Sequence, residues 1–549
     1  MWIKLHPAIW RSRLAFALIV SVILVGLYNW RFWTETIAAV NPTSIEDVLF
    51  VASLFPVLVI AYSAALMLVP GATMLRLVAA ASFLLAATSA FFIDSYNVII
   101  DKELIRNLFE TDMQEASAFL TPRFAVYFIL LGVAPAVVAM RTKLVVRPLK
   151  QQLRYGIGFF ATGLCVSVSL LFFFFPHYTS FFTEHKTERK LLNPVQTLTG
   201  LAGYWSSLHP FDDVAFVADP ESKAQLLAAA RGPKPLLLFL VVGETARGAN
   251  FQLGGYAQPT NPELSQMEGI YYFDNMLSCG TSTAVSVPCI FSPRGHDHFD
   301  VSVARQHSNL LDTLKDAGFR IEWFENNSSS KGMAARVKTH NFIGNARKAG
   351  CSHDPCYDEE MLSGLDDRLK TLKQNTVIVF HDMGSHGPAY WQRYPTSFEK
   401  FKPVCQTSEL WKCSHAALVN TYDNTILYTD HVLARQAHLL ESLSQVADSL
   451  LIYISDHGES LGEYGLYLHG APYSFAPDEQ TRVPYLIWMS QGYRQRFSIK
   501  KDCMQSHRHD VLTHDNIYHS VLGALGVRNG FYKKTLDMMS PCGASRGAL

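Results

Sequence analysis

The chain has 549 residues, of which 49% are hydrophobic and 17% are charged. So apolar a chain is not expected to be disordered, because disorder requires low hydrophobicity and high charge. Lysine plus arginine and aspartate plus glutamate both total 47, so the formal net charge is zero. Nucleic-acid-binding domains usually carry a basic surplus, and we therefore expect no nucleic-acid partner.

The first third of the chain contains long stretches without charge. Residues 1–175 hold 13 lysines and arginines and 9 aspartates and glutamates, which lie mostly between five uncharged stretches. A transmembrane helix needs about 17–25 apolar residues, so these stretches predict a helical transmembrane domain over residues 1–176. The approximate cores of the five predicted spans are 14–30, 48–69, 75–93, 124–140 and 155–176.

These apolar stretches allow two other interpretations. Each could be a core helix of a soluble protein, but five such segments in series argue against this. The first could be a signal peptide, because basic residues precede it. However, Arg31-Phe32-Trp33 follows the apolar run, where a cleavage site would need small residues.

The connectors between the predicted spans differ in charge, which predicts their orientation. Residues 141–154 carry five basic side chains and no acid, whereas residues 94–115 carry six acids and two bases. Because basic connectors stay cytoplasmic, we place the N-terminus and residues 141–154 in the cytoplasm. With the N-terminus in the cytoplasm, five spans place the chain after about residue 177 on the opposite side of the membrane. Residues 177–215 are interpreted as an amphipathic connection along the membrane surface, with an ordinary linker as the alternative.

The cysteines support export of the second part. Cys165 lies in the fifth predicted span, and the other eight cysteines all follow residue 278. An even number of cysteines in an exported part predicts disulfides, although eight cysteines allow 105 pairings. A zinc–thiolate site is the weaker alternative, because no Cys-x-x-Cys pair is present. Closeness in the chain favours Cys279–Cys289, Cys351–Cys356 and Cys405–Cys413, which leaves Cys503–Cys542.

The exported part, residues 216–549, alternates between strand-length apolar runs and helix-like segments. The runs are continuous, as in strands that are covered on both faces, and this order predicts an α/β domain with a mainly parallel sheet. The predicted strands are 236–242, 320–324, 376–380, 450–455 and 483–489, and the predicted helices are 306–317, 359–373 and 416–448. In such a sheet the active site lies beyond the carboxyl ends of the strands.

Polar clusters follow three of the predicted strands. Glu244 comes directly after the first, Asp456-His457 after the fourth, and the segment His381–Pro388 after the third. Each cluster alone could be a helix cap or a tolerant turn. Because parallel strands end at one edge of the sheet, their side chains are predicted to converge. Carboxylates and imidazole are good zinc ligands, so Glu244, Asp456 and His457 are candidate metal ligands.

A hydroxyl-rich segment between Cys279 and Cys289 offers a nucleophile. A hydroxyl at a helix start lies where backbone N–H groups favour phosphate, and a nearby metal would lower the pKa of that hydroxyl. The alternative is an ordinary helix cap. The residue types alone do not distinguish among the four candidates Thr281, Ser282, Thr283 and Ser286.

These motifs together resemble one known family, the lipid A phosphoethanolamine transferases, which include the transferable polymyxin-resistance enzymes. The resemblance covers essentially the whole chain. It implies five N-terminal spans and a periplasmic zinc domain of the alkaline-phosphatase/sulfatase fold. The motifs that carry it are Gly243-Glu-Thr-Ala-Arg, Cys279-Gly-Thr-Ser-Thr-Ala, Ser286-Val-Pro-Cys, Gly384-Ser-His-Gly-Pro, Ser455-Asp-His-Gly-Glu-Ser-Leu-Gly-Glu and Leu468-His-Gly.

The resemblance also implies roles for individual residues. Thr283 matches the nucleophile, and it matches a zinc ligand together with Glu244, Asp456 and His457. His386 and His469 match histidines near the phosphoryl group, where family members sometimes bind an additional zinc. Contacts to the lipid headgroup are implied for Ser328, Lys331, Asn107, Thr111 and Glu115; by charge, Lys331 suits a phosphate and Glu115 suits an ammonium.

The function that the resemblance implies is a two-step transfer in the inner membrane of a Gram-negative bacterium. Phosphoethanolamine would pass from phosphatidylethanolamine to Thr283 and then to a phosphate of lipid A, which lowers the negative surface charge that attracts polymyxins. We expect a monomer. Alternatives are another acceptor, such as lipopolysaccharide core or a periplasmic glucan, or transfer of phosphoglycerol. A further alternative is a membrane-anchored phosphatase or sulfatase, although this sequence lacks the Cys/Ser-x-Pro-x-Arg signature of sulfatases. The last alternative is an inactive envelope-assembly protein.

Overall fold

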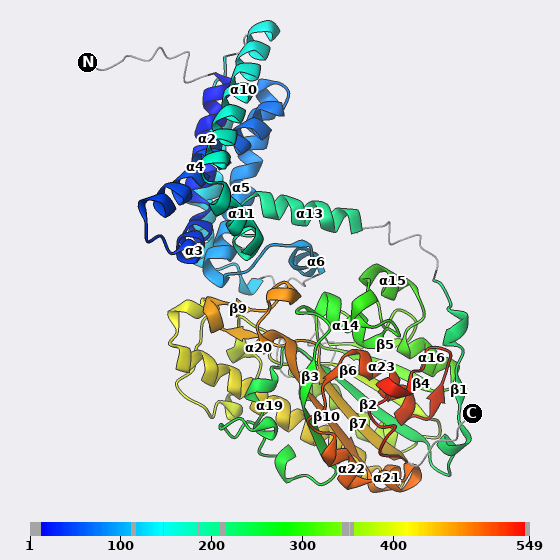
Figure 1. Ribbon diagram of the computed structural model, residues 1–549. Coiled ribbons are helices and arrows are strands. Elements are labelled where there is room, and N and C mark those ends of the chain that lie inside the picture. The colour runs from blue at the N-terminus through cyan, green and yellow to red at the C-terminus, as the bar shows by residue number, and fades with distance from the viewer. Residues whose placement is uncertain are drawn as a thin grey trace. The chain divides into compact units, whose positions relative to one another are not determined.

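The computed structural model describes residues 12–110, 117–145, 148–184, 186–207, 216–342, 351 and 356–543. These residues form two compact units (Figure 1). Unit 1 comprises Met1–Ile105 and Leu120–Tyr204, and unit 2 comprises Arg106–Phe119 and Trp205–Leu549. Most of the predicted connection 177–215 therefore belongs to unit 1, whereas residues 106–119 belong to unit 2 although unit 1 flanks them in the sequence.

The described residues up to 207 form helices joined by short non-helical connections. Side-chain caps begin several of the helices: the Ser12 hydroxyl accepts from the backbone of α2, and Ser44 and Asp47 form a capping box at α4. The helices are α2 (Arg13–Leu27), α3 (Trp30–Val40), α4 (Ile45–Leu68), α5 (Ala72–Tyr96), α6 (Lys102–Glu110), α8 (Pro122–Tyr127), the π-helical η1 (Phe128–Val133), α9 (Ala134–Arg141), α10 (Leu149–Phe173), α11 (Phe175–Glu184), α12 (Lys186–Arg189) and α13 (Val195–Ser207).

Several of these helices are suited to a membrane. Within the described residues, four helical segments are long and apolar enough to cross one: Ile45–Leu68, Ala72–Tyr96, Pro122–Arg141 and Lys150–Phe173. The pair α2 and α3, bent by 61° at its break, makes a fifth if it counts as one span. The predicted helical region with up to five apolar spans is therefore confirmed at this level.

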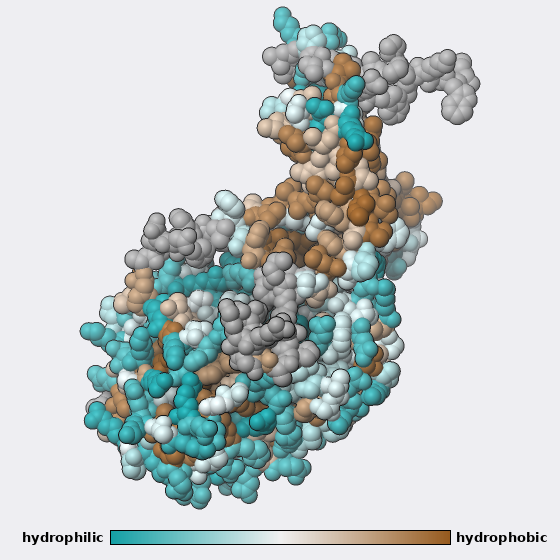
Figure 2. All heavy atoms as spheres, turned by 180° about the vertical axis from the view of Figure 1, so that it is seen from behind, coloured by the Kyte–Doolittle hydropathy of each residue, from teal (hydrophilic) through white to brown (hydrophobic). Residues whose placement is uncertain are grey.

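The surface of unit 1 is apolar where a soluble protein would be polar. Figure 2 shows hydrophobic side chains spread over the N-terminal helices. On α10, for example, Leu164 is 65% exposed and Phe172 is 77% exposed. Apolar surface of this extent is typical of contact with lipid rather than water.

Unit 2 contains an eight-stranded sheet among the described residues, in the order β11-β3-β10-β7-β2-β6-β4-β5. All neighbouring strands pair in parallel except at β10, which is antiparallel to both of its neighbours. The strands are β2 (Leu236–Gly243), β3 (Ile270–Leu277), β4 (Arg320–Glu325), β5 (Lys338–Asn341), β6 (Thr376–His381), β7 (Asp448–Ser455), β10 (Arg482–Met489) and β11 (Leu512–Thr513). Two-stranded pairs are formed by β1 (Gln225–Leu226) with β12 (Val527–Arg528) and β8 (Ser460–Leu461) with β9 (Tyr467–Leu468).

Helices cover this sheet, and its central strands form the core. Every residue of β2, β6 and β7 is buried, which explains their continuous apolar sequences. The helices of unit 2 are α14 (Thr283–Phe291), α15 (Val301–Gln306), α16 (Leu310–Asp316), α18 (Leu365–Leu369), α19 (His415–Ser442), α20 (Asp478–Thr481), α21 (Gln491–Phe497), α22 (Lys501–Ser506) and α23 (Asp515–Ala524).

All five predicted strands are present, but one predicted helix is not continuous. Instead of a helix over 359–373, a 3-10 turn, Asp358–Leu362, is followed by α18. Gly364 separates them with φ +68°, a left-handed conformation that ends a helix. The sheet also contains β3, β5 and β11, which the apolar runs did not indicate.

Four disulfides lie in unit 2. They join Cys279 to Cys289, Cys351 to Cys356, Cys405 to Cys413 and Cys503 to Cys542. These are the pairs that closeness in the chain favours. The first disulfide ties the segment before α14 to the last turn of that helix, and α14 begins at Thr283.

A buried carboxyl on α19 makes the stability of unit 2 depend on pH. Asp430 accepts hydrogen bonds from the backbone N–H groups of Glu263 and Leu264, at 2.9 and 3.2 Å. Burial nevertheless raises the pKa of Asp430 to about 7. Because this pKa exceeds the unfolded value of about 4, the folded protein retains a proton that the unfolded chain loses, and stability falls as pH rises from about 4 to 7.

Substitution of Asp430 should reduce that pH dependence. Between pH 5 and 8, the Tm of the full-length protein in detergent should fall less for Asp430→Asn than for wild type. The two decreases in Tm over this interval should differ by roughly 2–4 °C. Asp300→Asn, at the exposed cap of α15, should keep the wild-type slope. Equal slopes for Asp430→Asn and wild type would contradict this account.

Candidate active site and metal centre

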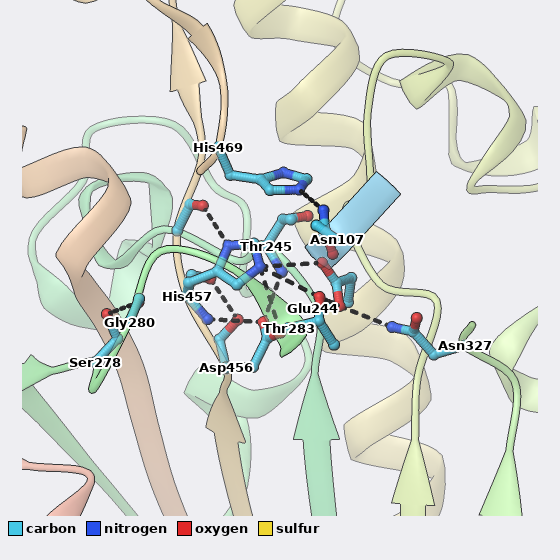
Figure 3. Close-up of polar contacts among 12 residues, drawn as sticks. Asn107, Glu244, Thr245, Ser278, Gly280, Thr283, Asn327, Asp456, His457 and His469 are labelled. Carbon is cyan, nitrogen blue, oxygen red and sulfur yellow. Dashed lines mark hydrogen bonds and ion pairs between the residues drawn. The ribbon is translucent and has the colours of Figure 1, made fainter. Parts of the chain in front are cut away.

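The carboxyl ends of two paired strands bring two carboxylates and one imidazole together. Glu244 follows β2 and Asp456-His457 follow β7, and the two strands pair in parallel up to Gly243 and Ser455. Glu244, Asp456 and His457 are fully buried. Each offers one ligand atom, and these atoms all lie within 4.8 Å of one another (Figure 3).

The orientation of each side chain leaves one ligand atom facing the centre of the cluster. Asp456 Oδ1 accepts the backbone N–H groups of Thr245 and His457, at 3.2 and 2.7 Å. His457 Nδ1 lies 2.9 Å from the carbonyl of Gly458. Because a carbonyl only accepts, Nδ1 carries the proton and Nε2 presents its lone pair. Nε2 lies 3.5 Å from Glu244 Oε1 and 3.4 Å from Asp456 Oδ2.

The residues of this cluster fit a divalent cation. Among the described residues, Glu244 Oε1 and Asp456 Oδ2 are buried without a hydrogen-bond partner. Burial raises the pKa of Asp456, and burial together with His469 lowers the pKa of His457 to about 3. The pocket thus disfavours charge on both groups, and a metal ion would favour the ligating carboxylate and neutral imidazole. Two carboxylates and one imidazole are a donor set that zinc accepts.

Close backbone packing supports the cluster. Gly384, in the loop after β6, has φ +52°, and a Cβ there would lie 2.7 Å from the carbonyl oxygen of Glu244. Only glycine fits at this approach. Thr245 has φ +52°, an uncommon conformation for a β-branched residue, directly after Glu244. Backbone strain of this kind is often found at functional sites.

Thr283 is the one hydroxyl of the four candidates that is hydrogen-bonded to the cluster among the described residues. Its Oγ1 donates to Glu244 Oε2 at 3.0 Å and lies 3.4 Å from His457 Nε2. It is the first residue of α14, and Ser282 is the cap. By contrast, Thr281 Oγ1 donates to the carbonyl of Ala471. Thr283 therefore faces the cluster where the helix N–H groups favour an anion.

Two further histidines lie beside the cluster. The ring of His469 lies 4.6 Å from that of His457 and 5.3 Å from that of His386, measured between centroids. His469 Nδ1 lies 3.5 Å from Glu459, a fully buried carboxylate. Among the described residues, the groups of three or more potential ligands do not include His386 or His469, so the additional zinc stays a prediction.

Three of the five residues predicted to contact the headgroup are described. Lys331 Nζ donates to Ser328 Oγ at 2.8 Å, and Lys331 is almost fully buried although it carries a charge. Asn107 Nδ2 lies 3.5 Å from His469 Nε2 (Figure 3). Thr111 and Glu115 lie outside the described residues.

Asn327 also belongs to the site, a residue for which the sequence predicts no role. Its Nδ2 donates to Glu244 Oε2 at 2.8 Å and to the carbonyl of Asp382 at 3.0 Å, and so orients the carboxylate. Glu325, at the end of β4, accepts from the backbone N–H of Asn327 and pairs with His381 Nδ1 at 2.8 Å. These residues follow or end β4 and β6, so the strand-end rule could have found them.

The comparisons with known proteins agree with this fold. Residues 237–527 match the Sulfatase family, and residues 58–208 match the family described as Phosphoethanolamine transferase EptA/EptB. The catalytic unit is thus of the sulfatase type, joined to a membrane unit of the transferase type. The chain belongs to the phosphoethanolamine transferase family.

Relatives match over nearly the whole chain. Phosphoethanolamine transferase EptA of Salmonella typhimurium is 36% identical over 536 residues, which covers 97% of each chain. Phosphatidylethanolamine transferase Mcr-1 of Escherichia coli is 36% identical over 501 residues, covering 88% of this chain and 91% of the relative. A solved structure that is similar is the integral membrane protein lipooligosaccharide phosphoethanolamine transferase A of Neisseria meningitidis. It superposes with a TM-score of 0.91 at 28% identity, covering 96% of this chain and 98% of the solved chain.

Removal of a ligand carboxylate should release bound metal. For Glu244→Gln and Asp456→Asn, elemental analysis of the purified protein should find the divalent metal per chain reduced at least about tenfold. Loss of a residue that only supports a metal ligand already lowers metal affinity by about that factor, and loss of a ligand itself should cost no less. Glu322→Gln is the matched control, because Glu322 is a buried carboxylate of the same unit that pairs with Arg320 and His340 instead. Stoichiometric metal in the Glu244 and Asp456 variants would rule out these ligands.

Proposed function

We propose that this enzyme transfers phosphoethanolamine from phosphatidylethanolamine to a phosphate of lipid A by way of Thr283. The observation that carries the proposal is the Thr283 hydroxyl at the start of α14, 3.0 Å from Glu244 and 3.4 Å from His457. The name of Mcr-1 supports the donor, and that of the Neisseria enzyme supports an acceptor in lipooligosaccharide, whose lipid part is lipid A.

In the first step, Thr283 Oγ1 attacks the phosphorus of the donor. A bond forms between Oγ1 and phosphorus, and the hydroxyl proton of Thr283 passes to its hydrogen-bond partner Glu244 Oε2. The bond to the diacylglycerol oxygen breaks, and diacylglycerol leaves with a proton. His386 and His469 lie beside the cluster, and one of them supplies that proton. A zinc ion held by Glu244, Asp456 and His457 would lower the pKa of the Thr283 hydroxyl and neutralise phosphoryl charge.

In the second step, a phosphate oxygen of the acceptor attacks the phosphorus, and Thr283 Oγ1 leaves with the proton that Glu244 held. The acceptor phosphate gives its proton to the histidine that protonated diacylglycerol. Positioning and charge neutralisation dominate phosphoryl transfer, and the residues around Thr283 supply both. Asn327 orients Glu244, the N–H groups at the start of α14 attract the phosphoryl oxygens, and the buried Lys331 ammonium adds positive charge. Asn107, Ser328, Thr111 and Glu115 complete the proposed headgroup contacts.

The membrane unit fits lipid substrates. Both the proposed donor and the proposed acceptor carry acyl chains that remain in a bilayer, so a soluble enzyme would meet them poorly. We assign residues 1–176 to the membrane, with the N-terminus cytoplasmic, and residues 216–549 to the periplasm of a Gram-negative bacterium. The four disulfides of unit 2 support an oxidising compartment.

Loss of the Thr283 hydroxyl should abolish transfer while sparing the metal site. With fluorescent phosphatidylethanolamine, release of fluorescent diacylglycerol should fall at least about a thousandfold for Thr283→Ala, as expected for loss of a nucleophile. Thr283→Ser keeps a hydroxyl and should stay within roughly tenfold of wild type. Mass spectrometry should find phosphoethanolamine on Thr283 of donor-treated wild type, and an active Thr283→Ala enzyme would exclude this nucleophile.

The acceptor is identified by the lipid A of cells that express the protein. Lipid A from these cells should gain the mass of one phosphoethanolamine group, and cells with Thr283→Ala should not. The added ammonium lowers surface negative charge, so polymyxin susceptibility should fall only with the active protein. Unchanged lipid A, with a modified core or glucan instead, would retain the chemistry but change the acceptor.

A further inference from the structure

The last turn of α6 reaches the active site. Residues 106–110 of α6 belong to unit 2, and Asn107 Nδ2 lies 3.5 Å from His469 Nε2 (Figure 3). Glu110 is three residues further along the same helix, so it lies on the same face as Asn107. Whatever holds Glu110 therefore also determines where Asn107 lies.

Arg305, at the end of α15, holds Glu110. Its Nη2 donates to Glu110 Oε2 at 2.7 Å, and the two side chains are 17% and 19% exposed. The stem of Arg305 packs against Gly332, where an added Cβ would lie 3.4 Å from Arg305 Cγ. Gly332 directly follows Lys331, whose Nζ is 3.4 Å from the carbonyl oxygen of Glu110. Within unit 2, the end of α6 thus meets two cationic side chains, Arg305 and Lys331.

Among the contacts described for this turn, the ion pair is the strongest. A short, charge-assisted and mostly buried pair is worth more than an exposed one, and removal of one partner leaves the other charge poorly solvated. By contrast, 3.5 Å between Asn107 and His469 is at the outer limit of a hydrogen bond and cannot anchor a helix. The pair Arg305–Glu110 is therefore the anchor, and Asn107 depends on it.

We propose that Arg305 is a positioning residue for the transfer reaction, because its ion pair with Glu110 holds the last turn of α6 so that Asn107 lies beside His469. The inference rests on the proposed function. Among the described residues, neither Arg305 nor Glu110 is hydrogen-bonded to Thr283, Glu244 or His457. The pair thus acts through the placement of Asn107, on recognition of the donor rather than on the metal or the nucleophile.

The test compares single, double and charge-swapped variants of the full-length protein in detergent. Arg305→Ala and Glu110→Ala should each raise KM for fluorescent phosphatidylethanolamine roughly tenfold, with kcat within about threefold, because they misplace a binding group and leave the reacting groups intact. The double alanine variant should be no worse than either single variant. The swap Glu110→Arg with Arg305→Glu should bring KM back to within about threefold of wild type.

A second cycle tests whether Arg305 acts through Asn107. In an Asn107→Ala background, Arg305→Ala should raise KM further by less than about twofold, since the group that it positions is already gone. Arg320→Ala is the matched control, because it removes an ion pair of the same 2.7 Å length at the other end of β4 from the site. Its KM should equal that of wild type. Thr283→Ala, tested under the proposed function, separates failure of that function from failure of this inference.

Metal content and Tm are measured for each variant, so that a general loss of structure is recognised. If an alanine variant unfolds, Arg305→Lys tests the positioning role instead. This variant keeps the positive charge but not the guanidinium fork, so its KM should lie between those of wild type and Glu110→Ala. The proposal would be overturned if the charge-swapped variant folds but its KM is not restored. It would also be overturned if Arg305→Ala and Asn107→Ala raise KM independently of each other.

Discussion

The burial of two carboxylates and an imidazole at the ends of β2 and β7 is the constraint on which this site depends. Parallel pairing in register places Gly243 opposite Ser455, so the next residues, Glu244 and Asp456, emerge side by side. Charge buried in this way is costly unless it is paired or bound to a metal. The surrounding structure meets that cost in part with backbone N–H groups on Asp456 and the amide of Asn327 on Glu244.

The same constraint relates the cluster of Glu244, Asp456 and His457 to the Thr283 hydroxyl, the proposed nucleophile. Thr283 donates to the Glu244 oxygen that Asn327 also contacts, while the other oxygen of Glu244 faces His457. One carboxylate therefore orients the hydroxyl and belongs to the candidate metal site. The disulfide between Cys279 and Cys289 brackets the turn and helix that carry Thr283, which limits how far this hydroxyl can move. A pre-organised hydroxyl of this kind suits the proposed transfer, in which positioning is the main contribution of the protein.

Much of the fold could be predicted because its signals are local. Uncharged stretches indicate the apolar helices, and the runs over β2, β6 and β7 are apolar throughout because both faces are covered. The strands that escaped prediction lack such a run. In β3, Asp274 and Asn275 interrupt the apolar sequence, and β5 is a short, largely exposed polar edge strand. The long predicted helix after residue 358 failed because a left-handed Gly364 divides it.

The sequence by itself determined the membrane and α/β parts of this protein, and it placed Glu244, Asp456 and His457 after strands, because hydrophobic periodicity and strand ends are local properties. With the family resemblance it also singled out Thr283. Only the tertiary structure brought Asn327 onto Glu244 and Arg305 onto Glu110. These contacts join residues 83 and 195 positions apart, and side-chain geometry over such separations depends on how the elements pack.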